Sequence, residues 1–156
     1  ACPVWSHCAA LEAGTVAERP APKKRTKVRR EARAVGVFVR DGRALLRRRP
    51  PEGLLAGMWE FPSEIVGLRA GERAVGDAVR ALAGELGLTV VGDAGEALVP
   101  VPHQFSHLHV IYRPWVMTVE GEITDAQEMR WTPLDDSGDL ALPVAQQRIA
   151  ALAANR

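Results

Sequence analysis

The sequence predicts one compact α/β domain in which a mixed β-sheet lies between helices, an α/β/α sandwich, preceded by a basic linker. Three observations predict it. Asp41-Gly42 separates two strand-like runs and is a strong hairpin signal, since both residues tolerate the positive φ of a tight turn. An amphipathic helical pattern covers residues 69–86, and a second helix is expected from Pro143. Strand-like runs lie between them, and this order is typical of a mixed sandwich.

The first 31 residues differ in character from the rest. Residues 9–14 indicate a short helical turn that ends at glycine, and the basic, proline-containing run 19–25 is typical of a linker. Cys2 and Cys8 are the two cysteines, and two ligands are too few for a closed zinc or iron–sulfur site, which needs four. The predicted organisation has three parts: residues 1–14, a linker over 15–31 and a compact domain over 32–156.

The compact domain begins with a predicted hairpin. Valines and a phenylalanine indicate a strand over residues 32–40, and residues 43–49 form the return strand. The run Pro50-Pro51-Glu52-Gly53 ends that strand. A glycine-punctuated apolar loop then leads to a short strand at Trp59-Glu60-Phe61-Pro62.

The helix over residues 69–86 is the clearest one, and Gly87 is its expected stop. Its apolar face has i, i+3, i+4 spacing and consists of Ala74, Val75, Ala78, Val79, Leu82, Ala83 and Leu86. Shorter strands are expected over residues 89–91, 96–101 and 128–131.

Residues 108–119 indicate a longer strand with two distinct faces. One face carries Val110, Tyr112, Pro114 and Val116, and the other carries His109, Ile111, Arg113, Trp115 and Met117. The final helix is expected to place Val144, Ile149 and Leu152 on its inner side.

The composition is that of a globular protein, but the charge is unevenly distributed. The chain of 156 residues is 47% hydrophobic and 25% charged, with no apolar run as long as a membrane span and no signal-peptide pattern. Residues 19–49 hold thirteen Lys and Arg against two acidic residues, a local charge of +11, and the remainder has −10. This asymmetry favours an anionic partner, most commonly nucleic acid. The alternative for residues 23–30 is a solvated basic linker.

The candidate functional stretch is His103-Gln104-Phe105-Ser106-His107-Leu108-His109. Prolines precede it, so it is expected to lie at a strand end or loop. An aromatic ring, a hydroxyl and an imidazole there can stack on and hydrogen-bond a planar heterocycle. Three alternatives stay open: an ordinary β-turn, Phe105 as a core residue, and a zinc site made by the three histidines, which has no carboxylate or cysteine nearby in sequence.

The helix and the strand before it resemble the Nudix family. Its conserved box is matched by Glu72, Arg80, Leu82, Glu85, Gly87 and Leu88. Ala81 and Gly84 stand where the family has metal-binding glutamates. Because Mg²⁺ needs several carboxylate oxygens, the two remaining glutamates would hold it only weakly. A Nudix-type nucleotide pyrophosphohydrolase is therefore kept as an alternative function.

A closer resemblance, over nearly the whole chain, is to the C-terminal part of MutY-type adenine DNA glycosylases. Four segments carry it, in the family's order: Cys2 to Cys8, resembling the last two ligands of an iron–sulfur loop; the basic linker; residues 48–62, resembling the family's "RP…GL…G.WEFP" segment; and Phe105-Ser106-His107. The resemblance implies a Nudix-like fold preceded by a remnant of the iron–sulfur loop.

The resemblance also implies a function in base-excision repair. The parent protein would hydrolyse the N-glycosidic bond of adenine opposite 8-oxoguanine, while this fragment would contain no catalytic residue. Phe105, Ser106, His107 and Gln104 would contact the lesion. Cys2 and Cys8 would be two of the four ligands of a 4Fe–4S cluster in the intact protein only, with no cofactor in the fragment.

The expected partner is double-stranded DNA with 8-oxoguanine:adenine mispairs, with no membrane partner. Repair or replication proteins are further candidates through the linker, and a protein-interaction module using that linker is a second alternative function. The expected location is bacterial, cytoplasmic and nucleoid-associated.

Overall fold

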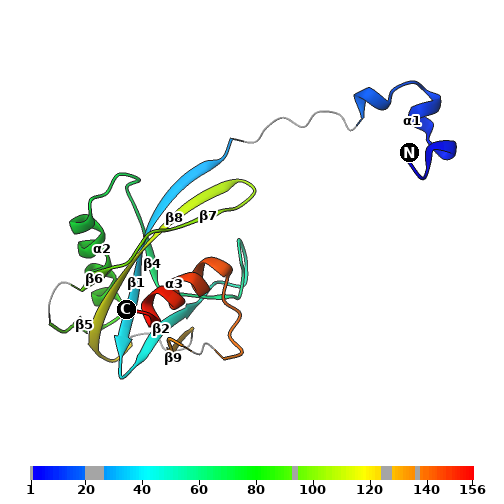
Figure 1. Ribbon diagram of the computed structural model, residues 1–156. Coiled ribbons are helices and arrows are strands. Elements are labelled where there is room, and N and C mark those ends of the chain that lie inside the picture. The colour runs from blue at the N-terminus through cyan, green and yellow to red at the C-terminus, as the bar shows by residue number, and fades with distance from the viewer. Residues whose placement is uncertain (1, 20–26, 93–94, 124–127, 136–137) are drawn as a thin grey trace.

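The computed structural model describes residues 2–19, 27–92, 95–123, 128–135 and 138–156 (Figure 1). Two long strands form the centre of its sheet, β1 (Arg29–Arg40) and β8 (Leu108–Gly121). They are parallel and paired in register from Arg29 opposite Leu108 to Val39 opposite Thr118. Both are rich in β-branched residues, as expected of strands that are covered on two faces.

Shorter strands extend this pair on both sides. In the described part of the chain they are β2 (Arg43–Arg48), β3 (Trp59–Glu60), β4 (Ser63–Val66), β5 (Leu88–Val90), β6 (Glu96–Ala97), β7 (Val101–Gln104) and β9 (Met129–Pro133). β2, β3 and β9 lie on the β1 side, whereas β5, β6 and β7 are antiparallel to β8. The β1–β2 turn is Asp41-Gly42, both with positive φ, which confirms the hairpin signal.

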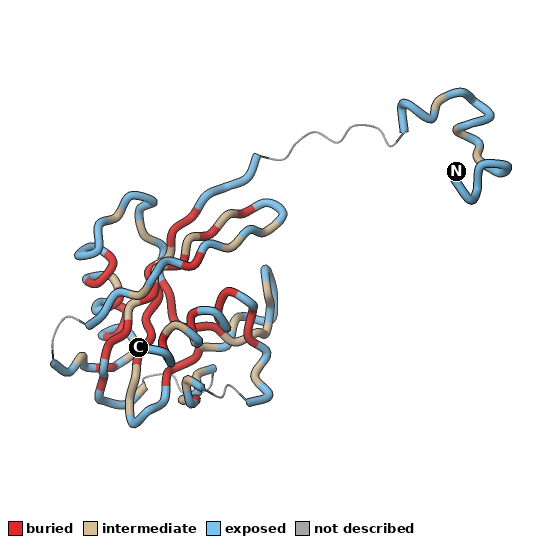
Figure 2. The backbone as a smooth tube through the Cα atoms, in the orientation of Figure 1, coloured by how far each residue is buried: buried red, intermediate tan, exposed pale blue. Residues whose placement is uncertain are grey.

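Two helices cover opposite faces of the sheet. α2 (Glu72–Glu85) packs on the face that carries Phe38, Met117 and Val119. α3 (Val144–Ala154) packs on the other face, where Val35, Val110 and Val116 lie. Figure 2 shows the buried residues concentrated in the strands between them. The predicted three-layer α/β/α sandwich and the two predicted faces of β8 are therefore confirmed.

Prolines explain where one predicted strand is wrong. The strand expected over residues 96–101 is divided into β6 and β7. Between them, residues 98–100 stand opposite only Arg113 and Pro114 of β8. Pro100 and Pro114 have no N–H to donate, so the ladder is interrupted by a bulge.

Other boundaries shift as well. β1 begins three residues before the expected start at residue 32, and β4 was not predicted. α2 begins at Glu72 rather than at residue 69, because Gly71 before it has extended backbone, and Ala74 is exposed rather than on the apolar face. Leu86 and Ala78 are half-buried, so the remaining apolar stripe is as predicted.

The predicted inner side of α3 is confirmed at two of its three residues. Ile149 is buried and Leu152 is half-buried against the same core cluster, whereas Val144 is exposed. The helix begins after Pro143, which is its N-cap. Gln146 is buried on the inner side, and its side-chain oxygen accepts a hydrogen bond from the Phe61 N–H at 3.1 Å. An apolar pattern cannot anticipate a polar residue that faces the core through such a bond.

The β7–β8 hairpin and the start of β1 project beyond the rest of the domain as a three-stranded ribbon (Figure 1). We define the ribbon as residues 29–33, 101–104 and 108–112. Its register places Gln104 opposite His109 and His109 opposite Arg30. The start of β1 is therefore held next to the end of the hairpin.

Residues 2–19 form three short helical elements: η1 (Trp5–His7), α1 (Ala9–Glu12) and η2 (Val16–Glu18). Gly14 follows α1 with a positive φ of 67°, which confirms the predicted helical turn. None of these three elements contains a buried residue. Among the described residues, no helix is long and apolar enough to cross a membrane.

Two glycines of α2 give a matched test of helix packing. A Cβ at Gly84 would meet no atom within 4 Å, whereas a Cβ at Gly76 would lie 3.0 Å from Cζ2 of Trp115. Gly84→Ala should raise the free energy of unfolding by about 0.5–1 kcal/mol, because alanine is the better helix former. Gly76→Ala should raise the free energy of unfolding by less than Gly84→Ala does, or lower it, because the new Cβ crowds the Trp115 ring. Denaturant unfolding measures both, and equal gains would contradict the packing of Trp115 on Gly76.

Candidate functional site

The candidate site is the tip of the β7–β8 hairpin, which we define as Phe105, Ser106 and His107. The last ladder pair before it is Gln104 opposite His109. The Phe105 N–H donates to the Leu108 carbonyl at 2.7 Å and closes a tight connection. Ser106 and His107 are exposed, and Phe105 is half-buried. The predicted loop between strands is thus confirmed, with a hydroxyl and an imidazole open to solvent.

Gln104 braces the tip. Its side-chain amide nitrogen donates to the carbonyl oxygens of Phe105 and, at 3.4 Å, of Leu108. The bond to Leu108 crosses the turn from β7 to β8. In this structure the Gln104 side chain, expected from the resemblance to contact the lesion, is bonded within the hairpin.

Phe105 lies at the border between core and surface. Its ring meets the ring of His103 edge-on, with 4.5 Å between centroids and 72° between planes. It also packs against the buried cluster that includes Leu108 and Val110. The alternative of Phe105 as a core residue is therefore partly right: one side of the ring is anchored, which fixes the direction in which the rest is presented.

The start of β1 adds basic side chains to the tip. The Arg29 N–H donates to the carbonyl of His107 at 3.1 Å, and Arg30 pairs with His109. The Arg29 side chain is 74% exposed. The sequence placed both arginines in the linker, but the structure places them in a strand that touches the tip.

Glu31 is a site residue that the sequence analysis missed. Its side chain is 7% exposed and accepts from Arg29 Nη2 at 3.1 Å and from Arg33 Nε at 2.6 Å. Arg33 Nη1 in turn donates to Ser63 Oγ at 3.3 Å. The alternation Arg-x-Glu-x-Arg was the available signal, because residues i, i+2 and i+4 of a strand share one face.

A second buried carboxylate lies at the base of the ribbon. Glu60 contacts Arg49 Nη1 at 2.5 Å and Arg47 Nη2 at 3.5 Å. Burial raises the pKa of the Tyr112 hydroxyl above its ordinary value of about 10, and the nearby Glu60 carboxylate raises it further, while Arg33 and Arg49 lower it. Charged groups around both buried carboxylates, Glu31 and Glu60, therefore shift the pKa of Tyr112.

The charged residues of the matching box lie on the solvent side of α2, whereas Leu82 of the same box is buried in the core. Glu72, Arg80 and Glu85 are exposed, as are Ala81 and Gly84 at the positions of the missing glutamates. Among the described residues, no group of three or more His, Cys, Asp and Glu side chains could hold a metal ion. The residues present do not form the carboxylate cluster that a magnesium site requires.

The two cysteines are free thiols, with Cys2 exposed and Cys8 half-buried. A closed iron–sulfur site needs four ligands, so these two thiols by themselves do not fit such a cluster.

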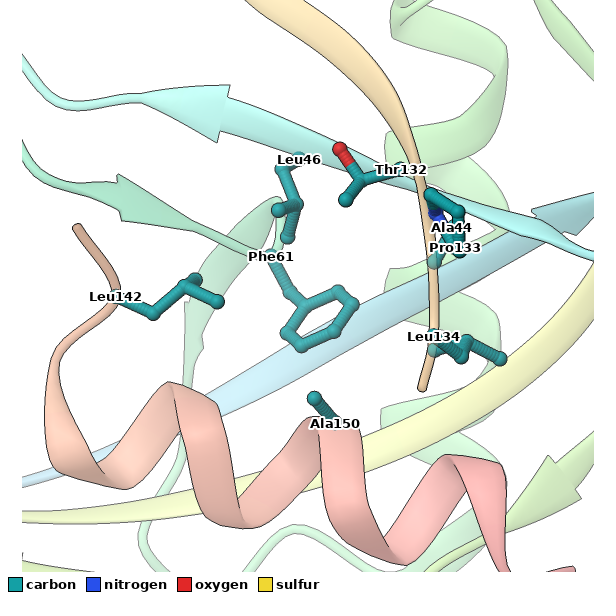
Figure 3. Close-up of a pocket in the computed structure, with 8 residues that line it drawn as sticks. All are labelled: Ala44, Leu46, Phe61, Thr132, Pro133, Leu134, Leu142 and Ala150. Carbon is teal, nitrogen blue, oxygen red and sulfur yellow. The ribbon is translucent and has the colours of Figure 1, made fainter. Parts of the chain in front are cut away.

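A small crevice between the sheet and α3 is lined mainly by apolar side chains. Figure 3 shows the Phe61 ring pointing toward the helix, with Leu142 and Ala150 around it. The crevice has room for about one water molecule. Thr132 is its one polar side chain among the lining residues. This surface does not fit a charged ligand, in contrast to the tip.

A family model described as NUDIX domain matches residues 34–152. Curated relatives include the adenine DNA glycosylase of Homo sapiens, 30% identical over 139 residues, which cover 83% of this chain and 25% of that protein. The adenine DNA glycosylase of Rattus norvegicus is 30% identical over 111 residues, 67% of this chain and 20% of that protein. The chain thus spans a quarter or less of the length of these relatives.

Solved structures share the fold. The C-terminal domain of mouse MUTYH, in complex with human PCNA, has a TM-score of 0.57 and 20% identity, covering 80% of this chain and 88% of that chain. A MutT NUDIX hydrolase from Burkholderia pseudomallei has a TM-score of 0.61 and 24% identity, covering 80% and 98%. MutT protein from Methanosarcina mazei has a TM-score of 0.64 and 20% identity, covering 80% and 92%. The expected Nudix-like fold is confirmed.

The raised pKa of Tyr112 predicts a loss of stability in alkaline solution. The folded state favours the neutral phenol, so the stabilisation is complete below the unfolded pKa of about 10 and is lost as the pH rises above it. Denaturant unfolding should therefore show a steeper fall in stability above about pH 10 for the native chain than for Tyr112→Phe. Tyr112 is the sole tyrosine, so phenolate absorbance follows this one group. Parallel pH profiles of the two proteins would refute the assignment.

Proposed function

The chain belongs to the NUDIX domain family, and from its exposed hairpin tip we propose that it is the lesion-recognition domain of an adenine DNA glycosylase, which binds 8-oxoguanine opposite adenine in double-stranded DNA. The observation that carries this proposal is the position of Ser106 and His107, exposed at the end of the ribbon beside Arg29 and Arg30. Basic side chains hold phosphates, and the polar tip contacts the base. The relatives that are adenine DNA glycosylases support a role in the removal of mispaired adenine.

Ser106 has the hydrogen-bonding capacity that the lesion requires. In guanine, N7 is an acceptor, whereas in 8-oxoguanine N7 carries a hydrogen and the neighbouring oxygen is a new acceptor. A hydroxyl accepts from one partner and donates to another. Ser106 accepts from N7–H and donates to the oxygen, and guanine presents the wrong pattern. Such a mismatch costs about 1–3 kcal/mol in a dry interface.

The other tip residues have supporting roles in this proposal. Phe105, anchored on one side by His103, inserts its exposed edge beside the base as an apolar wedge. His107 contacts a phosphate. Gln104 holds the turn in the geometry that presents Ser106.

The catalytic step belongs to the parent enzyme. In this proposal another domain flips the adenine out of the duplex and hydrolyses its N-glycosidic bond, while residues 29–156 recognise the lesion on the opposite strand. Cys2 and Cys8 are two of four ligands of a 4Fe–4S cluster that residues outside this chain complete. No catalytic role is assigned to a residue of this chain.

The proposal extends to partners and location. The linker expected over residues 15–31, of which residues 29–31 lie in β1, is a candidate binding segment for repair or replication proteins, and its residues 20–26 lie outside the described ones. The fold relative from mouse was solved with human PCNA, which supports a replication-linked partner. A DNA repair role fits a bacterial cytoplasm, close to the nucleoid.

Duplex binding by the 156-residue chain tests lesion recognition. We expect Ser106→Ala to reduce the preference for 8-oxoguanine:adenine over guanine:adenine duplexes by about tenfold, the worth of 1–2 kcal/mol. Phe105→Ala should weaken binding to both duplexes. The measurement is fluorescence anisotropy at low and fixed salt, since phosphate contacts make affinity salt-dependent.

The matched control removes a hydroxyl from the far end of the same strand. Thr118 is exposed in β8, and Thr118→Val should leave the preference unchanged. A native chain without preference for 8-oxoguanine, or a Ser106→Ala chain that keeps it, would exclude the proposed role of the tip.

The likeness to MutT hydrolases favours one second candidate, a nucleotide pyrophosphohydrolase. Ala81 and Gly84 remove two of the carboxylates that its magnesium ion needs. We therefore expect no magnesium-dependent release of pyrophosphate or phosphate from oxidised nucleoside triphosphates above background.

The double variant Ala81→Glu, Gly84→Glu tests the same idea in the opposite direction. Both positions are exposed, and a Cβ at Gly84 meets no atom within 4 Å, so the variant should fold. Isothermal titration should detect tighter magnesium binding in the variant than in the native chain. Turnover by the native chain would replace lesion recognition with hydrolysis as its function.

A further inference from the structure

Burying the carboxylate of Glu31 is unfavourable unless a cation pairs with it. It sits in β1 between two arginines on the same strand face, with its side chain 7% exposed. On the inner side, Arg33 connects it to Ser63 of β4. On the outer side, it holds Arg29, whose backbone N–H is bonded to His107 of the tip. A continuous chain of polar contacts therefore runs from β4 to the tip.

Arg29 is suited to bind an anion while it is held in this way. A guanidinium has five N–H donors in a planar fork, and the contact with Glu31 is made by Nη2 at 3.1 Å. The side chain is 74% exposed, so its outer edge faces solvent beside the tip. A planar donor array held from behind has a defined direction, which a flexible surface arginine does not have.

We propose that Glu31 is a positioning residue that holds Arg29 as a clamp for a DNA phosphate next to the hairpin tip. The inference rests on the proposed function and adds to it the residue that sets the register of the tip on the duplex. Phosphate contacts fix the position of a protein on DNA, and base contacts then read the sequence. A held Arg29 places Ser106 over one base, whereas a mobile Arg29 binds phosphates without fixing that position.

A positioning role for Glu31 predicts opposite effects of Glu31→Gln on the two duplexes, whereas a change of net charge alone would affect both duplexes in the same direction. Glu31→Gln raises the positive charge beside the tip by one, so binding to undamaged duplex should stay equal or become tighter. Binding to the 8-oxoguanine duplex should instead weaken, because Arg29 loses its fixed direction. The preference for the lesion should fall by about threefold to tenfold, the range for one partly exposed charge-assisted hydrogen bond.

The experiment measures both duplexes with the native chain and four variants: Glu31→Gln, Arg29→Ala, the double variant, and Glu64→Gln as the matched control. Glu64 is exposed in β4, opposite Ala34, and its removal makes the same change in net charge. We expect Glu64→Gln to keep the native preference. In the Arg29→Ala background, Glu31→Gln should cause no further loss, because its effect acts through Arg29.

The variant Glu31→Asp controls for the possibility that Glu31→Gln loses the preference because it unfolds. It keeps the buried negative charge that Arg33 needs, but its shorter side chain cannot reach both arginines. It should lower the lesion preference as Glu31→Gln does, while thermal unfolding stays closer to that of the native chain.

The outcomes separate this inference from the proposed function. If Ser106→Ala loses the preference and both Glu31 variants keep it, the tip reads the lesion without Glu31 and the inference is wrong. Additive losses in the double variant also overturn it, because Glu31 would then act by a route other than Arg29. A native chain with no preference removes the proposed function and this inference together.

Discussion

The parallel pairing of β1 with β8 is the interaction on which the rest of the structure depends. It joins residues 29–39 to residues 108–118, which are far apart in the chain, in one unbroken register. Alternation along both strands then creates two apolar faces, one covered by α2 and the other by α3. At its outer end the same register brings Arg29 to His107. Core and candidate site are thus two consequences of one pairing.

Buried carboxylates change the meaning of the basic segment. Burying a carboxylate is unfavourable unless cations accompany it, and Glu31 and Glu60 are each held by two arginines. Part of the charge excess over residues 19–49 is therefore structural, since Arg33, Arg47 and Arg49 neutralise groups inside the fold. The arginines at the start of β1 differ because they lie at the exposed end of the ribbon.

The scaffold separates two regions that could carry chemistry. The helix α2 presents the charged box residues to solvent on one face of the sheet, while the hairpin tip lies at the end of the ribbon. Two missing carboxylates weaken the first region as a metal site. The second combines an exposed hydroxyl, an anchored aromatic ring and adjacent arginines, the groups used for contacts with bases and phosphates. Membership of the NUDIX domain family is compatible with a function in either region, and the side chains present favour the tip as the functional region.

The sequence by itself determined the elements with strong local signals. Asp41-Gly42 specified the hairpin, the periodicity of residues 75–83 specified the buried stripe of α2, and Phe105-Ser106-His107 was identified as a loop between strands. The resemblance to the Nudix family gave the fold. These signals are local because turn geometry and apolar periodicity act within a few residues.

Only the tertiary structure decided which distant residues meet. The strand break at Pro100 depends on Pro114 across the ladder, and the buried Gln146 of α3 is satisfied by the hydrogen bond that it accepts from the Phe61 N–H. Arg29 became part of the site because β1 pairs with β8. Such contacts are set by pairing and desolvation between segments far apart in the chain, and one segment's sequence does not contain them.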